Sequence, residues 1–314
     1  MGRPKRRLMV LGTPGWFAGL EFNADRIQIT GVDFAGQKLL PEQIQLPAQP
    51  TAADLQYLIR SSLATYRDKQ DLPLLGIGVG APGLVNSEKG ICLRYSFVEG
   101  WENIPLRDTL LDRFGVAVTV ENNLRAIALA ERWFGGHREV TDYVIVGPRS
   151  GFAIASVQRG RLIHGAHHAV GEIGLWPWPL AGDNSPREMH RVLSAPMTYR
   201  RLAGLPETAP VPADLHTALA SLVHDQSTQW GDVAIDFARV LGCVQLMLDP
   251  ELCILHGPLT ALGDRFCHAI MDATYNVAPA LKDVRLKLVR SELGDDAGAL
   301  GAASLAMENW MPRL

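Results

Sequence analysis

The chain has 314 residues, of which 47% are hydrophobic and 20% are charged, and its formal net charge is -3. This is enough apolar sequence to bury the cores of two domains. The lack of a basic excess excludes a broad DNA-binding face, and no apolar run reaches the ~20 residues of a membrane span. We therefore expect a soluble, cytoplasmic protein whose four cysteines are buried free thiols.

The first half of the chain alternates strand and helix patterns. Runs with β-type composition predict strands at 16–22, 26–34, 74–79 and 116–120. Apolar residues at helical spacing predict helices at 51–69, 104–114 and 122–134. Thr51 is the expected N-cap of the first helix, because its hydroxyl can accept from a first-turn amide. The strand at 74–79 ends in a glycine-rich loop that includes Gly83.

The second half repeats this organisation. Paired strands are predicted at 142–146 and 151–158, and single strands at 252–255 and 285–289. Several helices are expected between 187 and 248, another from 259, and a closing helix from about 296 to 310. Strands that alternate with helices are typical of an α/β fold with largely parallel sheets.

Four groups of motifs occur in a fixed order along the chain. They are GIGVGAPG at 76–83 with WENIPL at 101–106, VTVENN at 118–123, GRLIHGA at 160–166 with GEIG at 171–174, and LGDDAGALGAA at 293–303. Each motif is weak alone, but together they resemble the ROK family of repressors, open reading frames and sugar kinases. The resemblance covers nearly the whole chain.

This resemblance implies an actin-like α/β fold, with two lobes and a ligand cleft between them. We expect a linker stub at 1–8, an N-terminal lobe at 9–121 and a C-terminal lobe at 122–295. The family's last helix packs back on the first lobe, and we expect the same of the helix at 296–311.

The family's kinases carry Glu-Asn-Asp before the hinge helix, where the Asn holds a sugar hydroxyl and the Asp is the general base. Here the triplet is Glu121-Asn122-Asn123. An amide cannot take up the proton at neutral pH, although it can still hydrogen-bond a hydroxyl. The resemblance thus implies that binding is kept and chemistry is lost. The alternative is that Asn122 and Asn123 only cap the following helix.

Three elements that bind ATP in the family's kinases are altered here. The first phosphate loop reads GLEFNAD at 19–25, without the glycines that allow close backbone approach. The second reads GPRSGFA at 147–153, and the adenosine-side Gly-Gly is replaced by His256-Gly257-Pro258. We therefore predict a protein that is not an enzyme and that takes no nucleotide cofactor.

The resemblance also implies a set of ligand-binding residues. Glu172 matches a sugar-contacting carboxylate, although it can also be read as a surface residue near a turn. A second sugar-contacting Glu aligns with His190, with Glu188 close by. We expect the ligand-binding residues Gly83, Asn122, Asn123, Glu172 and His190. The family's zinc-binding His is Leu175 here, and residues 180–189 contain no cysteine, so we predict no metal.

The family's repressors join a winged helix-turn-helix to the sugar lobe through a Gly-Arg-Pro stretch. This chain begins with GRPKRR at 2–7, as if cut at that junction, although a chance basic N-terminus is the alternative. We expect the sugar-sensing effector domain of a ROK-type transcriptional regulator, responding to a carbohydrate or sugar phosphate. DNA contact would come only from a helix-turn-helix outside this chain, and the state would be a homodimer or homotetramer. The rival readings are an ATP-dependent sugar kinase and a ligand-free structural dimer.

Overall fold

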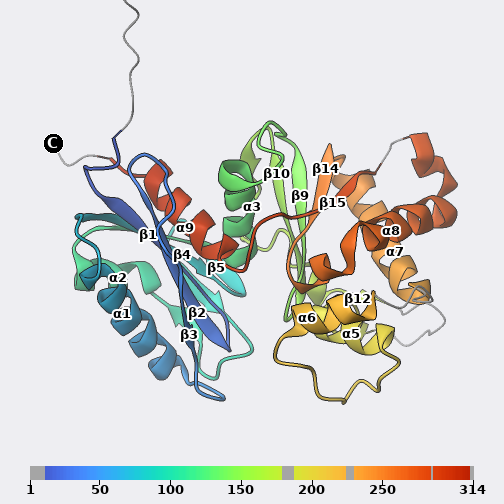
Figure 1. The fold of residues 1–314 in the computed structure, drawn as a ribbon, viewed down its shortest axis with the longest axis horizontal. Coiled ribbons are helices and arrows are strands. Elements are labelled where there is room, and N and C mark those ends of the chain that lie inside the picture. Colours follow the sequence, from blue (N-terminus) through green and yellow to red (C-terminus); the bar gives the residue numbers. More distant parts are fainter. Residues whose placement is uncertain (1–10, 179–186, 224–229, 284–285, 312–314) are drawn as a thin grey trace, which may run out of the picture. The chain divides into compact units, whose positions relative to one another are not determined.

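The computed structural model describes residues 11–178, 187–223, 230–283 and 286–311, so the expected linker at 1–8 lies outside the described residues. The chain forms two compact units. The first comprises Met1–Trp133 with Asp296–Leu314, and the second comprises Phe134–Asp295. Each unit is built on one five-stranded sheet with helices on its faces (Figure 1). None of the helices in these ranges is long and apolar enough to cross a membrane.

The first sheet has the strand order β3-β2-β1-β4-β8. Its strands are β1 (Trp16–Phe22), β2 (Arg26–Asp33), β3 (Glu42–Gln45), β4 (Leu74–Ala81) and β8 (Ala117–Asn122). β1, β2 and β3 form an antiparallel meander, whereas β1, β4 and β8 run parallel to one another. The carboxyl ends of these three parallel strands therefore meet at one edge of the sheet.

Helices cover both faces of the first sheet. They are α1 (Ala52–Asp68), α2 (Leu106–Phe114), α3 (Asn123–Phe134) and α9 (Ala297–Glu308). α1 and α2 lie on one side, and α9 lies on the other (Figure 1). α1 begins with a capping box, in which the Thr51 hydroxyl accepts from the Asp54 amide and Asp54 accepts from the Thr51 amide.

α9 lies very close to the sheet because glycines face it. A β-carbon built on Gly78 of β4 would lie 1.7 Å from the Ala302 carbonyl oxygen. On α9 itself, a β-carbon on Gly301 would lie 1.7 Å from the carbonyl oxygen of Ala126 in α3. These contacts join α3 and α9 in the first unit. The predicted boundary at 121/122 would instead assign α3 to the second lobe, and the observed division falls after Trp133.

A small three-stranded sheet follows the glycine-rich loop of the first unit. It consists of β5 (Leu84–Asn86), β6 (Ile91–Arg94) and β7 (Glu102–Ile104). Sequence patterns do not predict it, because strands of three or four residues are too short to show a period.

The second sheet repeats the topology of the first, in the order β11-β10-β9-β14-β15. Its strands are β9 (Tyr143–Pro148), β10 (Phe152–Gln158), β11 (Arg161–Leu162), β14 (Leu252–Leu255) and β15 (Leu288–Arg290). β9, β10 and β11 are antiparallel, and β14 runs parallel to both β9 and β15. A two-stranded ribbon is formed by β12 (Pro177–Trp178) and β13 (Arg187–Glu188).

The helices of the second unit enclose a single apolar core with this sheet. The α-helices are α4 (His190–Leu193), α5 (Ala195–Leu202), α6 (Leu215–Leu222), α7 (Gly231–Leu248) and α8 (Gly263–Val277). Three 3₁₀ turns are η1 (Ile173–Leu175), η2 (Pro258–Leu262) and η3 (Pro279–Asp283).

The four cysteines are free thiols, as predicted, but they are not all buried. Cys92, Cys253 and Cys267 are buried, and burial raises the pKa of each thiol to about 12. Cys243 is exposed, which corrects the sequence prediction. It lies in α7, where Leu246 and Met247 of the next turn are also exposed, so this part of the helix faces away from the core.

Candidate functional site

Two carboxylates are buried at the carboxyl edge of the first sheet. Glu21 lies near the end of β1 and Glu121 near the end of β8, and each is 2% exposed. Ionised carboxylates at this depth require hydrogen-bond donors or cations, since an uncompensated buried charge is costly. The surrounding residues supply both.

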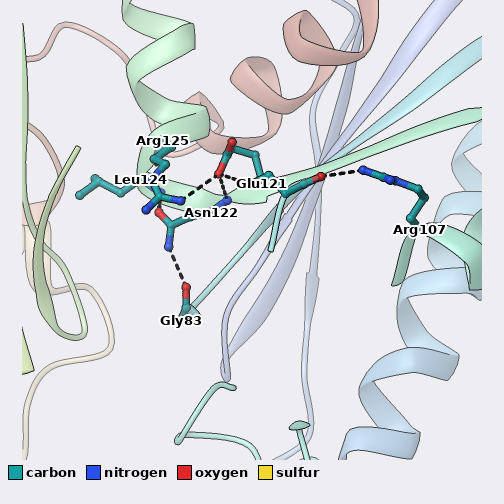
Figure 2. Close-up of polar contacts among 7 residues, drawn as sticks. Gly83, Arg107, Glu121, Asn122, Leu124 and Arg125 are labelled. Carbon is teal, nitrogen blue, oxygen red and sulfur yellow. Dashed lines mark hydrogen bonds and ion pairs between the residues drawn. The ribbon is translucent and has the colours of Figure 1, made fainter. Parts of the chain in front are cut away.

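Glu121 is the centre of a hydrogen-bonded network (Figure 2). Its Oε1 accepts from the Ser87 hydroxyl at 2.8 Å and from the Asn122 amide at 2.7 Å. The same oxygen pairs with the buried Arg125 guanidinium at 3.4 Å, one helical turn along α3. Arg107 of α2 donates to the backbone carbonyls of Ser87 and Glu88, at 2.6 Å each. The loop after β5 is thereby fixed against the end of β8.

Asn122 joins the end of β8 to the glycine-rich loop. Its Oδ1 accepts from the amides of Leu124 at 2.9 Å and Arg125 at 3.3 Å, which caps α3. Its Nδ2 donates to the Gly83 carbonyl at 2.9 Å (Figure 2). Gly83 has φ +74°, and a β-carbon there would lie 2.2 Å from the Arg94 carbonyl oxygen, so the loop needs glycine. The cap predicted as an alternative reading is present, and it holds Asn122 beside Gly83.

Asn123 is half-buried next to the other buried carboxylate. Its Nδ2 donates to Oε1 of Glu21 at 3.4 Å. The Glu21 carboxylate also lies against the first turn of α9, where a β-carbon on Gly298 would be 2.3 Å from Oε2. The side chain at position 123 is thus the amide neighbour of a carboxylate. The structure brings together three of the five predicted ligand-binding residues, Gly83, Asn122 and Asn123.

The turn between β1 and β2 has its backbone donors engaged within the protein. The Asn23 amide donates to the Arg26 carbonyl at 3.1 Å, and the amides of Asp25 and Arg26 donate to Oδ1 of Asn23 at 2.8 Å. The Ala24 amide donates to the Tyr95 hydroxyl at 3.2 Å. Every backbone N–H from residue 23 to residue 26 therefore has a protein acceptor.

The carboxyl edge of the second sheet carries different chemistry. Nδ1 of the buried His256 lies 3.2 Å from the Ser291 hydroxyl. Burial, and secondarily the charge of Arg149, lowers the pKa of His256 to about 3, so the ring is neutral at pH 7. The Arg149 side chain packs over Gly257, where an added β-carbon would lie 3.1 Å from its Cγ. The sequence lacks the family's second glycine-rich loop at this point, and the Arg149 side chain fills the space.

The other two predicted ligand-binding residues belong to the second unit. Glu172 is half-buried, directly before η1. His190 begins α4, and its Nδ1 accepts from the Phe152 amide at 2.9 Å. Burial lowers the pKa of His190, and the charge of Glu188 partly opposes this shift. A β-carbon on Gly174 would lie 2.3 Å from Cε1 of His190, so the ring contacts the segment that carries Glu172.

No three His, Cys, Asp or Glu side chains are grouped to hold a metal ion in the ranges that the structure describes. Residues 180–186 of the segment that replaces the family's zinc loop lie outside those ranges.

Several residues of the first edge were not predicted from the sequence. Glu21, Ser87, Arg107 and Arg125 all hold the network in place, yet none was predicted to matter. Glu21 had a readable signal, since it is a charged residue within the otherwise apolar strand WFAGLEF. Arg125 had none, because Glu121 lies in β8 and not on the helix that carries Arg125, so helical spacing does not relate the two residues.

The chain is 28% identical to the xylose repressor of Caldicellulosiruptor bescii over 176 residues, which are 55% of this chain and 44% of the repressor. It is 25% identical to the glucokinase of Thermotoga maritima over 279 residues, covering 80% of this chain and 84% of the kinase. The match to the repressor thus spans less than half of that protein's length.

A solved ROK family transcriptional regulator, a homologue of the Escherichia coli MLC protein, superposes with a TM-score of 0.78 and 22% identity, over 95% of this chain and 78% of that one. This likeness shows the fold, which is the actin-like α/β fold predicted from the motifs. The ROK family model matches residues 17–187, more than half of the sequence. The chain belongs to the ROK family.

Proposed function

We propose that this chain is a non-catalytic, sugar-sensing effector domain of a ROK-type transcriptional regulator. The β1–β2 turn carries the proposal. This turn is the first phosphate loop in the family's kinases, where backbone amides hold phosphate oxygens. Here the four amides of residues 23–26 donate to Asn23, Arg26 and Tyr95. A triphosphate would have to break these bonds before the amides could hold its oxygens.

The chemistry of Asn123 supports the same proposal. A general base must accept a proton at working pH, and a carboxamide does not. The Asn123 amide instead donates to the buried Glu21 carboxylate. The side chain at this position therefore serves a neighbouring charge rather than an attacking hydroxyl.

We propose Gly83, Asn122 and Asn123 in the first unit, and Glu172 and His190 in the second, as the residues that contact a carbohydrate or sugar phosphate. Amide, carboxylate and imidazole groups suit this role, because a sugar must have its many hydroxyls hydrogen-bonded when it loses water. The proposal assigns DNA binding to a separate helix-turn-helix domain. It also expects a homodimer or homotetramer in the cytoplasm.

An ATP-dependent sugar kinase is the second candidate. The Thermotoga maritima glucokinase favours it, because the match extends over 84% of that enzyme. The observed turn and Asn123 argue against it. The amides that would bind the nucleotide are engaged within the protein, and position 123 has no carboxylate to remove the proton.

Two measurements decide between these functions. A coupled assay for ADP, run with ATP, Mg²⁺ and a panel of hexoses, amino sugars and pentoses, should show no turnover above background. Calorimetry with the same panel should show binding of at least one sugar. ADP release that depends on a sugar would establish the kinase instead, and failure of every sugar and sugar phosphate to bind would leave a structural role.

A matched pair of variants tests the ligand-binding residues. Glu172→Gln keeps the side-chain shape and removes the charge, so affinity for the bound sugar should fall about tenfold, as expected for a lost charge-assisted hydrogen bond. Glu251→Gln changes an exposed Glu of the same unit and should leave affinity unchanged. Equal affinities in the two variants would remove Glu172 from the site.

A further inference from the structure

His190 has a single hydrogen bond to the described residues, and that bond fixes the ring's protonation. The Phe152 amide points at Nδ1 with a separation of 2.9 Å. A backbone N–H can only donate, so Nδ1 must be the acceptor and cannot carry a proton. The neutral ring therefore carries its proton on Nε2.

The ring is also held by close packing on two backbone segments. A β-carbon on Gly151, in the turn before β10, would lie 2.7 Å from Nδ1. A β-carbon on Gly174 would lie 2.4 Å from the same atom and 2.0 Å from the Phe152 carbonyl oxygen. Glycine at both positions lets the two segments approach the imidazole directly. The ring therefore contacts both the β9–β10 turn and the segment Gly171–Leu175, beside the direct contact between Gly174 and the Phe152 carbonyl.

The Gly171–Leu175 segment also contacts β10 directly. The Gly171 carbonyl accepts from the Ile154 amide at 3.0 Å, and a β-carbon on Gly171 would lie 2.0 Å from the Ile154 carbonyl oxygen. Glu172 lies in the middle of this segment. The contact between Gly174 and the His190 ring adds to these direct contacts in holding the segment against β10.

We infer that His190 is a positioning residue that helps to hold the Gly171–Leu175 segment, and with it Glu172, against the β9–β10 turn. Because Nδ1 is committed to Phe152, the ring offers a ligand only the Nε2–H donor. A ligand group that meets His190 must then be a hydrogen-bond acceptor, whereas Glu172 accepts from ligand hydroxyls. The statement about ligand groups rests on the proposed function, whereas the positioning role does not.

Two substitutions test the hydrogen-bond acceptor and the ring volume of His190 separately. His190→Asn places Oδ1 near the position of Nδ1 and keeps an acceptor for the Phe152 amide, but it has no group at Nε2. His190→Phe keeps a ring of similar size and removes the acceptor. His268→Phe, at an exposed position of α8, is the control for a His-to-Phe change in the same unit.

Amide hydrogen exchange in the ligand-free protein tests the positioning role. In His190→Phe, protection of the Phe152 amide should fall roughly tenfold or more, because a buried donor loses its acceptor. Leu175 and Trp176 should lose protection with it. His190→Asn should retain most of the protection at all three amides, and His268→Phe should retain all of it. Unchanged protection in His190→Phe would overturn the inference.

Ring nitrogen chemical shifts test the tautomer directly. The His190 signals should show a protonated Nε2 and an unprotonated Nδ1 at pH 7.5, and a proton on Nδ1 would contradict the assignment. For any sugar that binds the wild type, His190→Asn should bind roughly tenfold more weakly even though its segment stays ordered, because only Nε2–H is lost. If no sugar binds the wild type, the proposed function fails while the exchange data still decide the positioning role.

Discussion

The two five-stranded sheets share one topology and differ in the side chains at their carboxyl edges. In each, three antiparallel strands are followed by two parallel ones, so the carboxyl ends of three strands meet. The first edge holds two buried carboxylates, Glu21 and Glu121. The second holds a buried neutral His256 beside Arg149. Topology fixes where an edge lies, and single side chains fix what it can bind.

The layers that cover the two sheets differ as well. α9 meets the first sheet through backbone contacts at Gly19 and Gly78. The second sheet packs against larger side chains, and Phe152 of β10 contacts Phe237 of α7, with ring centroids 5.9 Å apart. The first layer is therefore sensitive to added volume, and the second to lost volume.

The largest effect is expected at the Glu121–Arg125 pair of the first edge. Glu121→Ala leaves the guanidinium buried without its carboxylate, which should lower the free energy of unfolding by about 3–5 kcal/mol. Glu42→Ala, which breaks the exposed pair with Lys69, should cost less than ~1 kcal/mol. Urea denaturation of both variants measures the difference. Similar losses would mean that the buried network is not what holds this edge.

The next effect probes the contact between α9 and the first sheet. Gly78→Ala puts a methyl group where the Ala302 carbonyl oxygen lies 1.7 Å away, and should destabilise the protein by about 3 kcal/mol. Gly80→Ala is the matched control two residues along the same strand, where the nearest atom is at 3.4 Å, and should change stability by less than ~1 kcal/mol. Thermal unfolding of the pair tests this. A stable Gly78→Ala variant would show that α9 can shift.

His256 should make the second edge sensitive to acid. Its folded pKa of about 3 lies below the ordinary value of 6.5, so the unfolded chain binds the proton first. The stability that neutral His256 contributes is complete above pH 6.5 and is lost as the pH falls toward 3. At pH 5 this loss amounts to about 2 kcal/mol of unfolding free energy. The difference in unfolding free energy between pH 7.5 and pH 5 should shrink by this amount in His256→Asn. An equal pH dependence in both proteins would mean that His256 is not buried in its neutral form.

Much of the fold could be predicted from sequence because it depends on local patterns. The helix at 51–69 and its Thr51 cap are present as α1, and the strand at 252–255 is β14. The division after Trp133 could not be predicted from the sequence, because α3 joins the first unit through Gly301, which is 175 residues from Ala126. No periodicity reports a contact between segments so far apart.

The candidate site was predicted as a set of residues but not as a network. Motif order indicated Asn122 and Asn123, and local sequence also indicated the cap that Asn122 forms on α3. The ring of His190 was expected to meet a ligand, whereas its Nδ1 is committed to the Phe152 amide, 38 residues away. The acceptors that satisfy the amides of the β1–β2 turn include the Tyr95 hydroxyl, which only the folded chain brings to Ala24.

The smallest expected effect, and the one that best sharpens the contrast between the two edges, is that of Asn123→Asp. It restores the carboxylate of the family's kinases but places it next to Glu21, where Asn123 now donates at 3.4 Å. Two carboxylates this close repel each other, so stability at pH 7.5 should fall by about 1 kcal/mol, measured by urea denaturation. The ADP assay should remain at background, because the amides of residues 23–26 are still engaged. Turnover in this single variant would show that the turn can open for a phosphate, and would support a kinase function for the chain.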